Sequence, residues 1–319
     1  MMSSHTALIV GISGQTGSYL ARELLGEGTT VVGTSRDADP SNLWRLSRLE
    51  ILDQIRVESM SPHDFRSVYS VIEKIRPDSI YFLGGQSSVG LSFKQPFETF
   101  ESISIPVMNI LEAIRLLNLD TRFLNSASSD MFGNQPGTTL DESSPMRPVS
   151  PYGVAKLASY WTTIQYRDAF GLFASNAILS NHESPLRGSQ FVTSKMVSQL
   201  KQVAEGHRTT LPFGNVSIRR DWLWAGDVAR GIAEVLNYDK PDDFIIGSGE
   251  SHSLLELIIA AGAALGVDAA SVLTQNDDDL RPNEIESINL NPQKIFQETS
   301  WSPEVSFDEL ALRLVAGKL

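Results

Sequence analysis

The stretch that decides the fold is "ALIVGISGQTGSYLARELLGEG", residues 7 to 28. Its first part, "ALIVGI" (7–12), is a short continuous apolar run, which is the pattern of a buried strand. Its last part, "GSYLARELLGEG" (17–28), has helical spacing and stops at a glycine. Glycines 11, 14 and 17 stand between the two parts. The stretch therefore predicts a strand, a glycine-rich turn and a helix, in that order.

The same alternation continues outward from this unit. We expect further strands at 29–36, 55–59, 79–85 and 122–128, and helices at 62–76, 106–118 and 151–168. Pro106 suits the first position of its helix, where a missing N–H costs little. Segment 242–249 resembles a last strand of the same sheet. Near-continuous apolar strands alternating with helices predict a doubly wound parallel α/β sheet covered on both faces.

Composition excludes several classes of protein. The 319 residues carry a net charge of −12, which argues against a general nucleic-acid or anionic-membrane surface. No apolar run is long enough to span a membrane. The chain has no cysteine, and its five scattered histidines lack ligand-like spacing, so neither thiolate chemistry nor a metal site is expected. The N-terminal residues lack the features of a signal peptide, so we expect a cytoplasmic location.

The glycine pattern predicts a dinucleotide site. Small residues between a strand and a helix let the backbone approach a pyrophosphate at the helix N-terminus. Gly11, Gly14, Gln15, Thr16 and Gly17 are therefore candidate cofactor residues. The second strand ends in "VVGTSRD" (31–37), where Arg36 could pair with the 2′-phosphate of NADP. The alternative is that Asp37 meets the ribose of NAD; we expect NADP.

A second motif, "SPYGVAK" (150–156), places Tyr152 and Lys156 four residues apart, on one face of a helix. A nearby ammonium would lower the pKa of the phenol, which would make tyrosinate available as a base near neutral pH. Ser128 ends a strand and could bond the same substrate hydroxyl.

With these motifs, the chain resembles the extended short-chain dehydrogenase/reductase superfamily over essentially its whole length. Further segments resemble the GDP-mannose 4,6-dehydratase family in order and spacing. They are "LGGQSSV" (83–89), "SASSDMFG" (126–133), "NHESPLRG" (181–188), "FVTSK" (191–195), "GNVSIRRDW" (214–222) and "RPNEI" (281–285). The resemblance implies a Rossmann domain over 1–180, also taking in about 222–249. It implies a substrate-binding lobe formed by 181–221 and 250–319.

The resemblance also implies a mechanism. In this family a Thr-x-Glu stands where this chain has Ser128-Ser129-Asp130. Carried over, Tyr152 is the base at C4 of the sugar, Lys156 its electrostatic helper and Ser128 the orienting hydroxyl. Asp130 removes the C5 proton and protonates the departing C6 hydroxyl. Since Asp is one methylene shorter than Glu, two other readings of Asp130 stay open: a remnant in a reductase or epimerase, or a turn residue bonding the backbone of 131–133.

The remaining site residues are also implied by the resemblance. Cofactor residues beyond the glycine loop and Arg36 are Leu83, Gly84, Tyr152, Lys156 and His182. Substrate residues are Gln86, Ser87, Asn181, Glu183, Lys195, Asn215, Arg220, Arg281 and Glu284, with the three cations holding the diphosphate.

The expected function is conversion of GDP-mannose or a close GDP-sugar to its 4-keto-6-deoxy form, with NADP recycled internally. The alternative is an NADP-dependent 4-keto-sugar-nucleotide reductase or epimerase. The resemblance further implies a homodimer or homotetramer. The loop at 36–48, with Leu43, Trp44 and Leu46, could contribute to assembly, as could the helices at 106–118 and 151–168.

Overall fold

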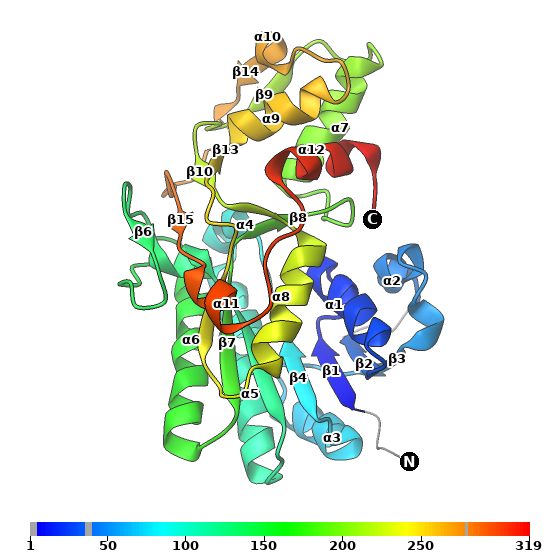
Figure 1. Cartoon of the computed structure of the whole chain (residues 1–319), viewed down its shortest axis with the longest axis vertical. Coiled ribbons are helices and arrows are strands. Elements are labelled where there is room, and N and C mark those ends of the chain that lie inside the picture. Colours follow the sequence, from blue (N-terminus) through cyan, green and yellow to red (C-terminus); the bar gives the residue numbers. More distant parts are fainter. Residues whose placement is uncertain (1–4, 36–39, 278–279) are drawn as a thin grey trace.

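The structure is a computed structural model that describes residues 5–35, 40–277 and 280–319. Its centre is a seven-stranded parallel sheet, which lies in the lower half of Figure 1. In sheet order the strands are β12 (Asp243–Ile246), β7 (Ala174–Leu179), β5 (Arg122–Ser128), β4 (Ser79–Phe82), β1 (Thr6–Val10), β2 (Thr30–Ser35) and β3 (Arg56–Ser59). The prediction of a doubly wound parallel sheet is confirmed.

Helices cover both faces of the sheet. One face carries α3 (Phe65–Ile75), α5 (Pro96–Leu116) and α6 (Pro151–Phe170), which pack side by side. The other carries α1 (Gln15–Gly26) and α8 (Ala225–Asn237). Because successive strand residues point to opposite faces, Leu8 packs in the core under α3 and α5, whereas Ile9 packs in the core under α1 and α8. Burial on both faces explains the continuous apolar strands.

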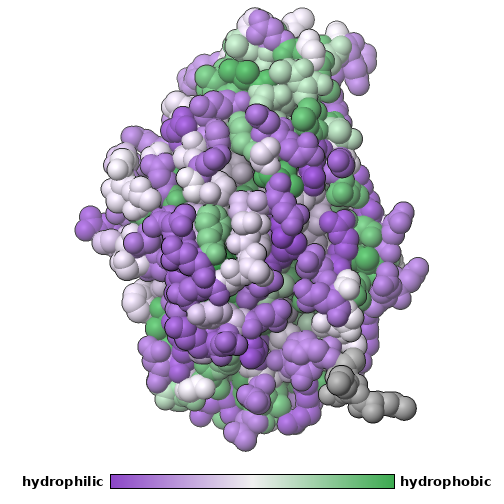
Figure 2. All heavy atoms as spheres, viewed as in Figure 1, coloured by the Kyte–Doolittle hydropathy of each residue, from purple (hydrophilic) through white to green (hydrophobic). Residues whose placement is uncertain are grey.

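A smaller group of elements stands beyond the carboxyl ends of the strands, at the top of Figure 1. It contains α7 (Val192–Ala204), β9 (Leu211–Phe213), β10 (Arg219–Arg220), β13 (His252–Ser253), α9 (Leu254–Ala263), α10 (Ala269–Val272), β14 (Leu273–Gln275) and α12 (Phe307–Ala316). Figure 2 shows a mostly hydrophilic face whose hydrophobic residues gather near the top, over α9, where Ile259 is exposed.

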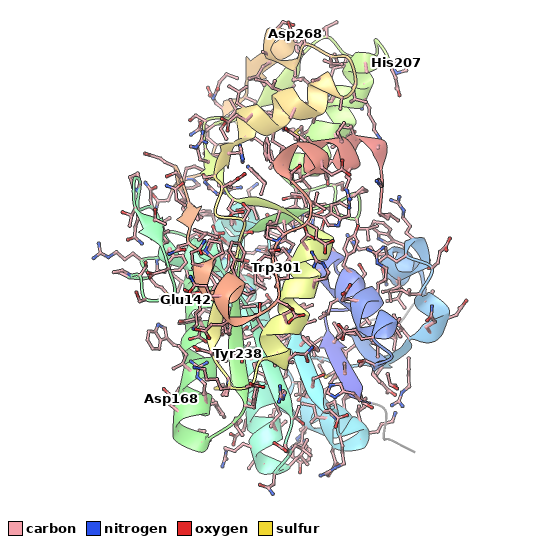
Figure 3. All side chains as sticks on the ribbon, viewed as in Figure 1. Glu142, Asp168, His207, Tyr238, Asp268 and Trp301 are labelled. Carbon is pink, nitrogen blue, oxygen red and sulfur yellow. The ribbon has the colours of Figure 1, made fainter. Side chains whose placement is uncertain are left out.

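Short elements connect these two parts. Two parallel pairs of short strands lie here: β8 (Asn181–Glu183) with β11 (Trp222–Trp224), and β6 (Thr139–Leu140) with β15 (Asn289–Leu290). The remaining short elements are η1 (Pro40–Leu43), α2 (Trp44–Arg48) and η2 (Leu52–Gln54) between β2 and β3, α4 (Val89–Lys94) after β4, η3 (Ser129–Phe132) after β5, and α11 (Gln293–Glu298) after β15. Trp301 returns to α8, where its indole N–H donates to the Asp227 carbonyl at 2.8 Å (Figure 3). Within the described part of the chain, none of the helices has the length and apolarity to cross a membrane.

Three expectations about elements need correction. Pro106 lies inside α5, which starts ten residues earlier with Pro96 in its first turn. The strand β7 was not expected, yet it lies between β5 and β12. Leu43 and Leu46 are buried in the core of their own chain, so they are not an apolar assembly surface; Trp44 alone of that trio is exposed.

Candidate active site

The glycine loop lies where β1 ends and α1 begins. Gly11 has a φ of +95°, and a Cβ there would lie 2.8 Å from the Gly84 amide nitrogen. A Cβ at Gly17 would lie 2.4 Å from the Gly11 carbonyl oxygen. Both positions therefore require glycine, which lets the loop pack against the end of β4. Gly14 caps α1 without a side-chain bond to its first-turn amides, as suits a helix N-terminus that meets an anion.

A cleft of about 1010 Å³ opens beside this loop, at the carboxyl ends of the strands. Most of the expected site residues line it, although they come from segments far apart in the chain. They are Gly14, Gln15, Thr16, Gly17, Leu83, Gly84, Gln86, Ser87, Ser128, Asp130, Tyr152, Lys156, Asn181, His182, Glu183, Lys195, Asn215, Arg220, Arg281 and Glu284. Gly11 supports the loop from behind. Arg36 and Asp37 lie outside the described residues.

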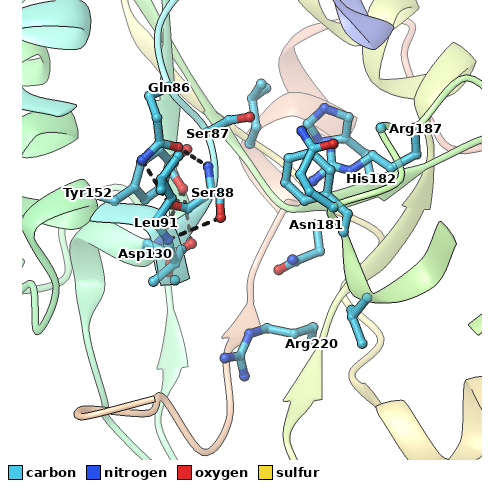
Figure 4. A pocket seen from close by; sticks show the side chains of 18 of the residues that line it. Gln86, Ser87, Ser88, Leu91, Asp130, Tyr152, Asn181, His182, Arg187 and Arg220 are labelled. Atoms are coloured by element: carbon cyan, nitrogen blue, oxygen red, sulfur yellow. Dashed lines mark hydrogen bonds between the residues drawn. The ribbon is translucent and has the colours of Figure 1, made fainter. Parts of the chain in front are cut away.

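Asp130 and Tyr152 lie on one wall of the cleft (Figure 4), and Ser128, which is bonded to Asp130, also lines it. Ser128 ends β5, and its hydroxyl donates to the Asp130 carboxylate at 3.3 Å. The backbone N–H of Asp130 donates back to the Ser128 hydroxyl oxygen, also at 3.3 Å. The turn at Gly133 is closed by the backbone carbonyl of Asp130, so the carboxylate stays directed at the cleft. This placement disfavours the reading of Asp130 as a turn residue.

Tyr152 lies in the first turn of α6, where the Ser150 hydroxyl caps the helix by accepting from the Gly153 N–H at 3.0 Å. Burial, and then the charge of Asp130, raises the pKa of Tyr152 above its ordinary value. The Lys156 ammonium lies 5.9 Å from the centre of the Tyr152 ring and donates to the Ser126 carbonyl at 2.6 Å. That this ammonium, together with the ring of a bound cofactor, lowers the pKa of the phenol stays a prediction. Burial also lowers the pKa of Lys156 to about 8.

The facing wall is built by β8 and the loop that follows it (Figure 4). His182 Nε2 lies 2.8 Å from the Thr16 hydroxyl, and His182 Nδ1 lies 2.9 Å from the Ser180 carbonyl oxygen. With Nδ1–H donating to that carbonyl, Nε2 accepts from Thr16, so the ring is neutral. Burial, and then the charge of Arg187, lowers the pKa of His182 to about 4.

Two expected substrate residues already have partners within the chain. Glu183 is buried and accepts from the Thr193 hydroxyl at 2.6 Å, while Arg187 Nε lies 3.4 Å from the same carboxylate. Burial raises the pKa of Glu183. Gln86 donates to the Ser88 carbonyl at 2.9 Å and accepts from the Ser88 N–H. Both side chains line the cleft and form hydrogen bonds within its walls.

The end of the cleft nearest the upper elements is cationic. Arg220 is buried, and its guanidinium lies 3.3 Å from the Glu284 carboxylate. Arg281 Nη1 lies 3.2 Å from the same carboxylate oxygen, so two cations share one anion. Lys195 lies over the Phe213 ring at 5.5 Å from its centroid. Asn215 also lines this end, and its side-chain oxygen accepts from the Ser217 hydroxyl at 2.7 Å. The local excess of positive charge suits a diphosphate.

Sequence reasoning missed two arginines that line the cleft, Arg45 and Arg187. Arg187 had a signal, because it lies four residues after Glu183 in a segment that carries the family resemblance, and the two side chains form an ion pair. Arg45 had none. Its Nε donates to the Leu186 carbonyl at 2.7 Å and its Nη1 to the Ser13 carbonyl at 3.0 Å, partners from distant parts of the chain.

Comparison with known proteins shows the family of this chain. The family model described as GDP-mannose 4,6 dehydratase matches residues 8–314. The chain belongs to the GDP-mannose 4,6-dehydratase family. GDP-mannose 4,6 dehydratase 2 of Arabidopsis thaliana is 35% identical over 319 residues, covering 97% of this chain and 85% of that protein. GDP-mannose 4,6-dehydratase of Vibrio cholerae is 34% identical, covering 97% of this chain and 92% of that protein.

Solved structures share the fold at lower identity. A dTDP-glucose 4,6-dehydratase from Streptomyces venezuelae with NAD and TYD bound has a TM-score of 0.86 at 22% identity, covering 98% of this chain and 96% of that one. RMD from Pseudomonas aeruginosa complexed with NADPH has a TM-score of 0.82 at 19% identity, covering 98% and 99%. The chain therefore shares its fold with both of these proteins.

Proposed function

We propose that this member of the GDP-mannose 4,6-dehydratase family dehydrates GDP-mannose, or a close GDP-sugar, to its 4-keto-6-deoxy form. The observation that carries the proposal is the placement of Ser128, Asp130 and Tyr152 on one wall of a cleft whose far end is cationic. A reacting sugar would lie against the wall, and its diphosphate would reach Lys195, Arg220 and Arg281. The elements beyond the strand ends would then form the substrate-binding lobe, and the main sheet the cofactor-binding domain.

The chain supplies the proton transfers. Tyr152 takes the proton of the C4 hydroxyl, which Ser128 orients. Asp130 removes the C5 proton and gives it to the C6 hydroxyl, which leaves as water. C5 then takes up a solvent-derived proton and Tyr152 releases the C4 proton to solvent, so the net change is the loss of one water. NADP⁺, when bound, would supply a hydride acceptor for C4 and, once reduced, a hydride donor for C6, and its positive charge would favour tyrosinate at Tyr152.

The glycine loop fits a nicotinamide dinucleotide, because Cβ atoms at Gly11 and Gly17 would clash with nearby backbone and prevent the tight turn before the N-terminus of α1. We favour NADP because Arg36 follows the second strand. The protein should bind NADP⁺ more tightly than NAD⁺, and Arg36→Ala should reduce that preference in a binding titration.

The experiment that tests the function is incubation of the purified protein with GDP-mannose and catalytic NADP⁺ in deuterated water. Mass spectrometry and NMR should show loss of water and one deuterium at C5. Asp130→Asn should slow this reaction by about 10²–10⁴-fold, because its amide cannot accept the C5 proton. Asp168→Asn on the exposed part of α6 is the matched control. If both ligands bind and no water is lost, the dehydratase proposal fails in favour of a reductase or epimerase.

A further inference from the structure

Side-chain hydrogen bonds join two loops that line the cleft and lie far apart in the sequence. The glycine loop (11–17) would hold the cofactor, and the β8 loop (180–188) would hold the substrate. Gln15 Nε2 donates to the His182 carbonyl at 3.0 Å, and Gln15 Oε1 accepts from the Ser184 hydroxyl at 2.7 Å. Thr16 adds the 2.8 Å contact to the His182 ring. The bonded residues are separated in the sequence by more than half of the chain length.

Arg45, from a third segment of the chain, also forms hydrogen bonds to both loops. Its Nε donates to the Leu186 carbonyl and its Nη1 to the Ser13 carbonyl, so one guanidinium bonds both loops. The fully buried Leu46 next to it fixes the backbone, and the Trp44 ring lies 4.3 Å from the guanidinium carbon. Arginine can make this pair of bonds because its donors form a rigid planar fork, whereas a lysine presents a single ammonium.

We propose that Arg45 is a positioning residue that couples the two ligand sites, so that a dinucleotide on the glycine loop organises the loop that binds the GDP-sugar. The glycines allow the glycine loop one tight backbone conformation. Through the hydrogen bonds of Arg45 and Gln15, that conformation fixes the position of the β8 loop. The latter loop carries Asn181 and Arg187 into the cleft. Ordering either loop therefore lowers the conformational cost of ordering the other.

Charge gives the coupling its sign. Burial, and then the charge of Arg187, lowers the pKa of Arg45, as expected for two guanidinium groups held near each other. Arg187 pairs with the Glu183 carboxylate and also lies over the Phe191 ring at 3.8 Å from its centroid. Arg45 bonds two carbonyl oxygens. An anionic ligand beside Arg45 and Arg187 offsets the repulsion between these two cations. Its binding therefore stabilises the contact between the two loops, and the coupling is positive.

The inference rests on the proposed function for the identity of the two ligands. Coupling between binding sites is reciprocal, so it can be measured from either side. We would titrate NADP⁺ into the full-length protein by calorimetry, with and without saturating GDP, which fills the nucleotide part of the substrate site. GDP should tighten NADP⁺ binding by about tenfold in the unmodified protein.

In Arg45→Lys, that factor should fall to within about twofold of unity. Arg48→Lys is the matched control, because it lies on the same short helix with its side chain exposed, and it should keep the full factor. Ser184→Ala, which removes the bond to Gln15 Oε1, should lower the factor in the same direction. It is the second test if Arg45→Lys fails to fold, as judged by thermal melting.

Two results would overturn the inference. One is an unchanged coupling factor in both Arg45→Lys and Ser184→Ala while the two ligands still bind. The other is a factor of one in the unmodified protein. Failure of NADP⁺ and GDP to bind at all would instead remove the proposed function, and the inference with it.

Discussion

Asp130 lies on the wall of the cleft, next to the other two residues proposed to act on the sugar. Its carboxylate accepts from Ser128 at 3.3 Å, and its charge acts on both Tyr152 and Arg220. The family resemblance implies a glutamate, one methylene longer, at this position in relatives. We therefore expect the shorter reach of Asp130 to limit how well it serves as an acid and base.

Lys156 predicts a pH limit for activity. Burial lowers its pKa to about 8, so its ammonium is lost as the pH rises through that value. Since a neutral amine no longer favours tyrosinate at Tyr152, kcat/KM should fall above about pH 8. Lys240→Ala, at an exposed position, should leave the profile unchanged. A flat profile between about pH 7 and 9.5 would argue against a role for this ammonium.

His182 predicts a pH dependence of stability. Its pKa falls from 6.5 to about 4 on folding, so between these values the unfolded chain takes up a proton that the folded protein refuses. Unfolding is therefore favoured as the pH drops. The stability of the unmodified protein relative to His182→Gln should fall by about 1–2 kcal/mol between pH 7 and pH 5, measured by urea unfolding. His63→Gln, at an exposed site, should show no such change with pH.

At the scale of elements, a buried polar network joins α6, β7 and β12. Asp243 accepts from both terminal nitrogens of Arg167, each at 3.0 Å, and from Asn176 at 2.9 Å and the Tyr160 hydroxyl at 3.1 Å. These bonds hold the last strand of the sheet to the helix behind it. The network also satisfies Asn176, whose side chain would otherwise be an unpaired polar group in the middle of a strand.

Removing the acceptor should therefore destabilise the protein strongly. Asp243→Ala leaves the half-buried Arg167 guanidinium without its carboxylate, and it should lower the free energy of unfolding by about 3 kcal/mol. Glu309→Ala breaks an exposed ion pair with Arg313 on α12 and should have a far smaller effect. Chemical denaturation of the two variants, side by side, is the measurement. Equal losses would mean that the network is not what holds β12.

The same elements show what sequence could and could not predict. The strand at 122–128 and the glycine turn follow from local patterns, because apolar runs and special backbone angles leave clear signals. The strand β7 left a weak one, since its Ser175 and Asn176 look solvent-exposed in sequence and are buried only because distant residues bond them. Pro106 looked like a helix start because nothing local shows that the turns before it are helical. Arg45 was missed for a similar reason, since both of its partners lie in other segments.

At the scale of the whole molecule, exposed apolar side chains gather on α5 and α6. Phe97 is 73% exposed and Trp161 57% exposed, while Phe100 and Val154 line a small groove between the helix starts. Such a patch is costly to leave in water. Assembly through these helices stays a prediction, and the surface supports it.

Trp161→Lys should therefore weaken assembly. Light scattering after size-exclusion chromatography should show a mass close to the 35.0 kDa of one chain, against a multiple of it for the unmodified protein. Leu312→Lys places the same charge at a comparably exposed leucine on α12 and should not change the mass. A variant at Trp161 that keeps the unmodified mass would move the interface elsewhere.

The place of β12 at the sheet edge has a consequence for biosynthesis. Six of the strands are complete once Leu179 has left the ribosome, but the seventh, which pairs with β7, comes roughly 70 residues later. At ~5–20 residues per second, the nascent protein spends about 4 to 14 seconds with the β7 edge uncovered. An open edge of apolar strand invites pairing with other chains. Ribosome-associated chaperones would find their binding site here, during translation of the segment from β8 to α8.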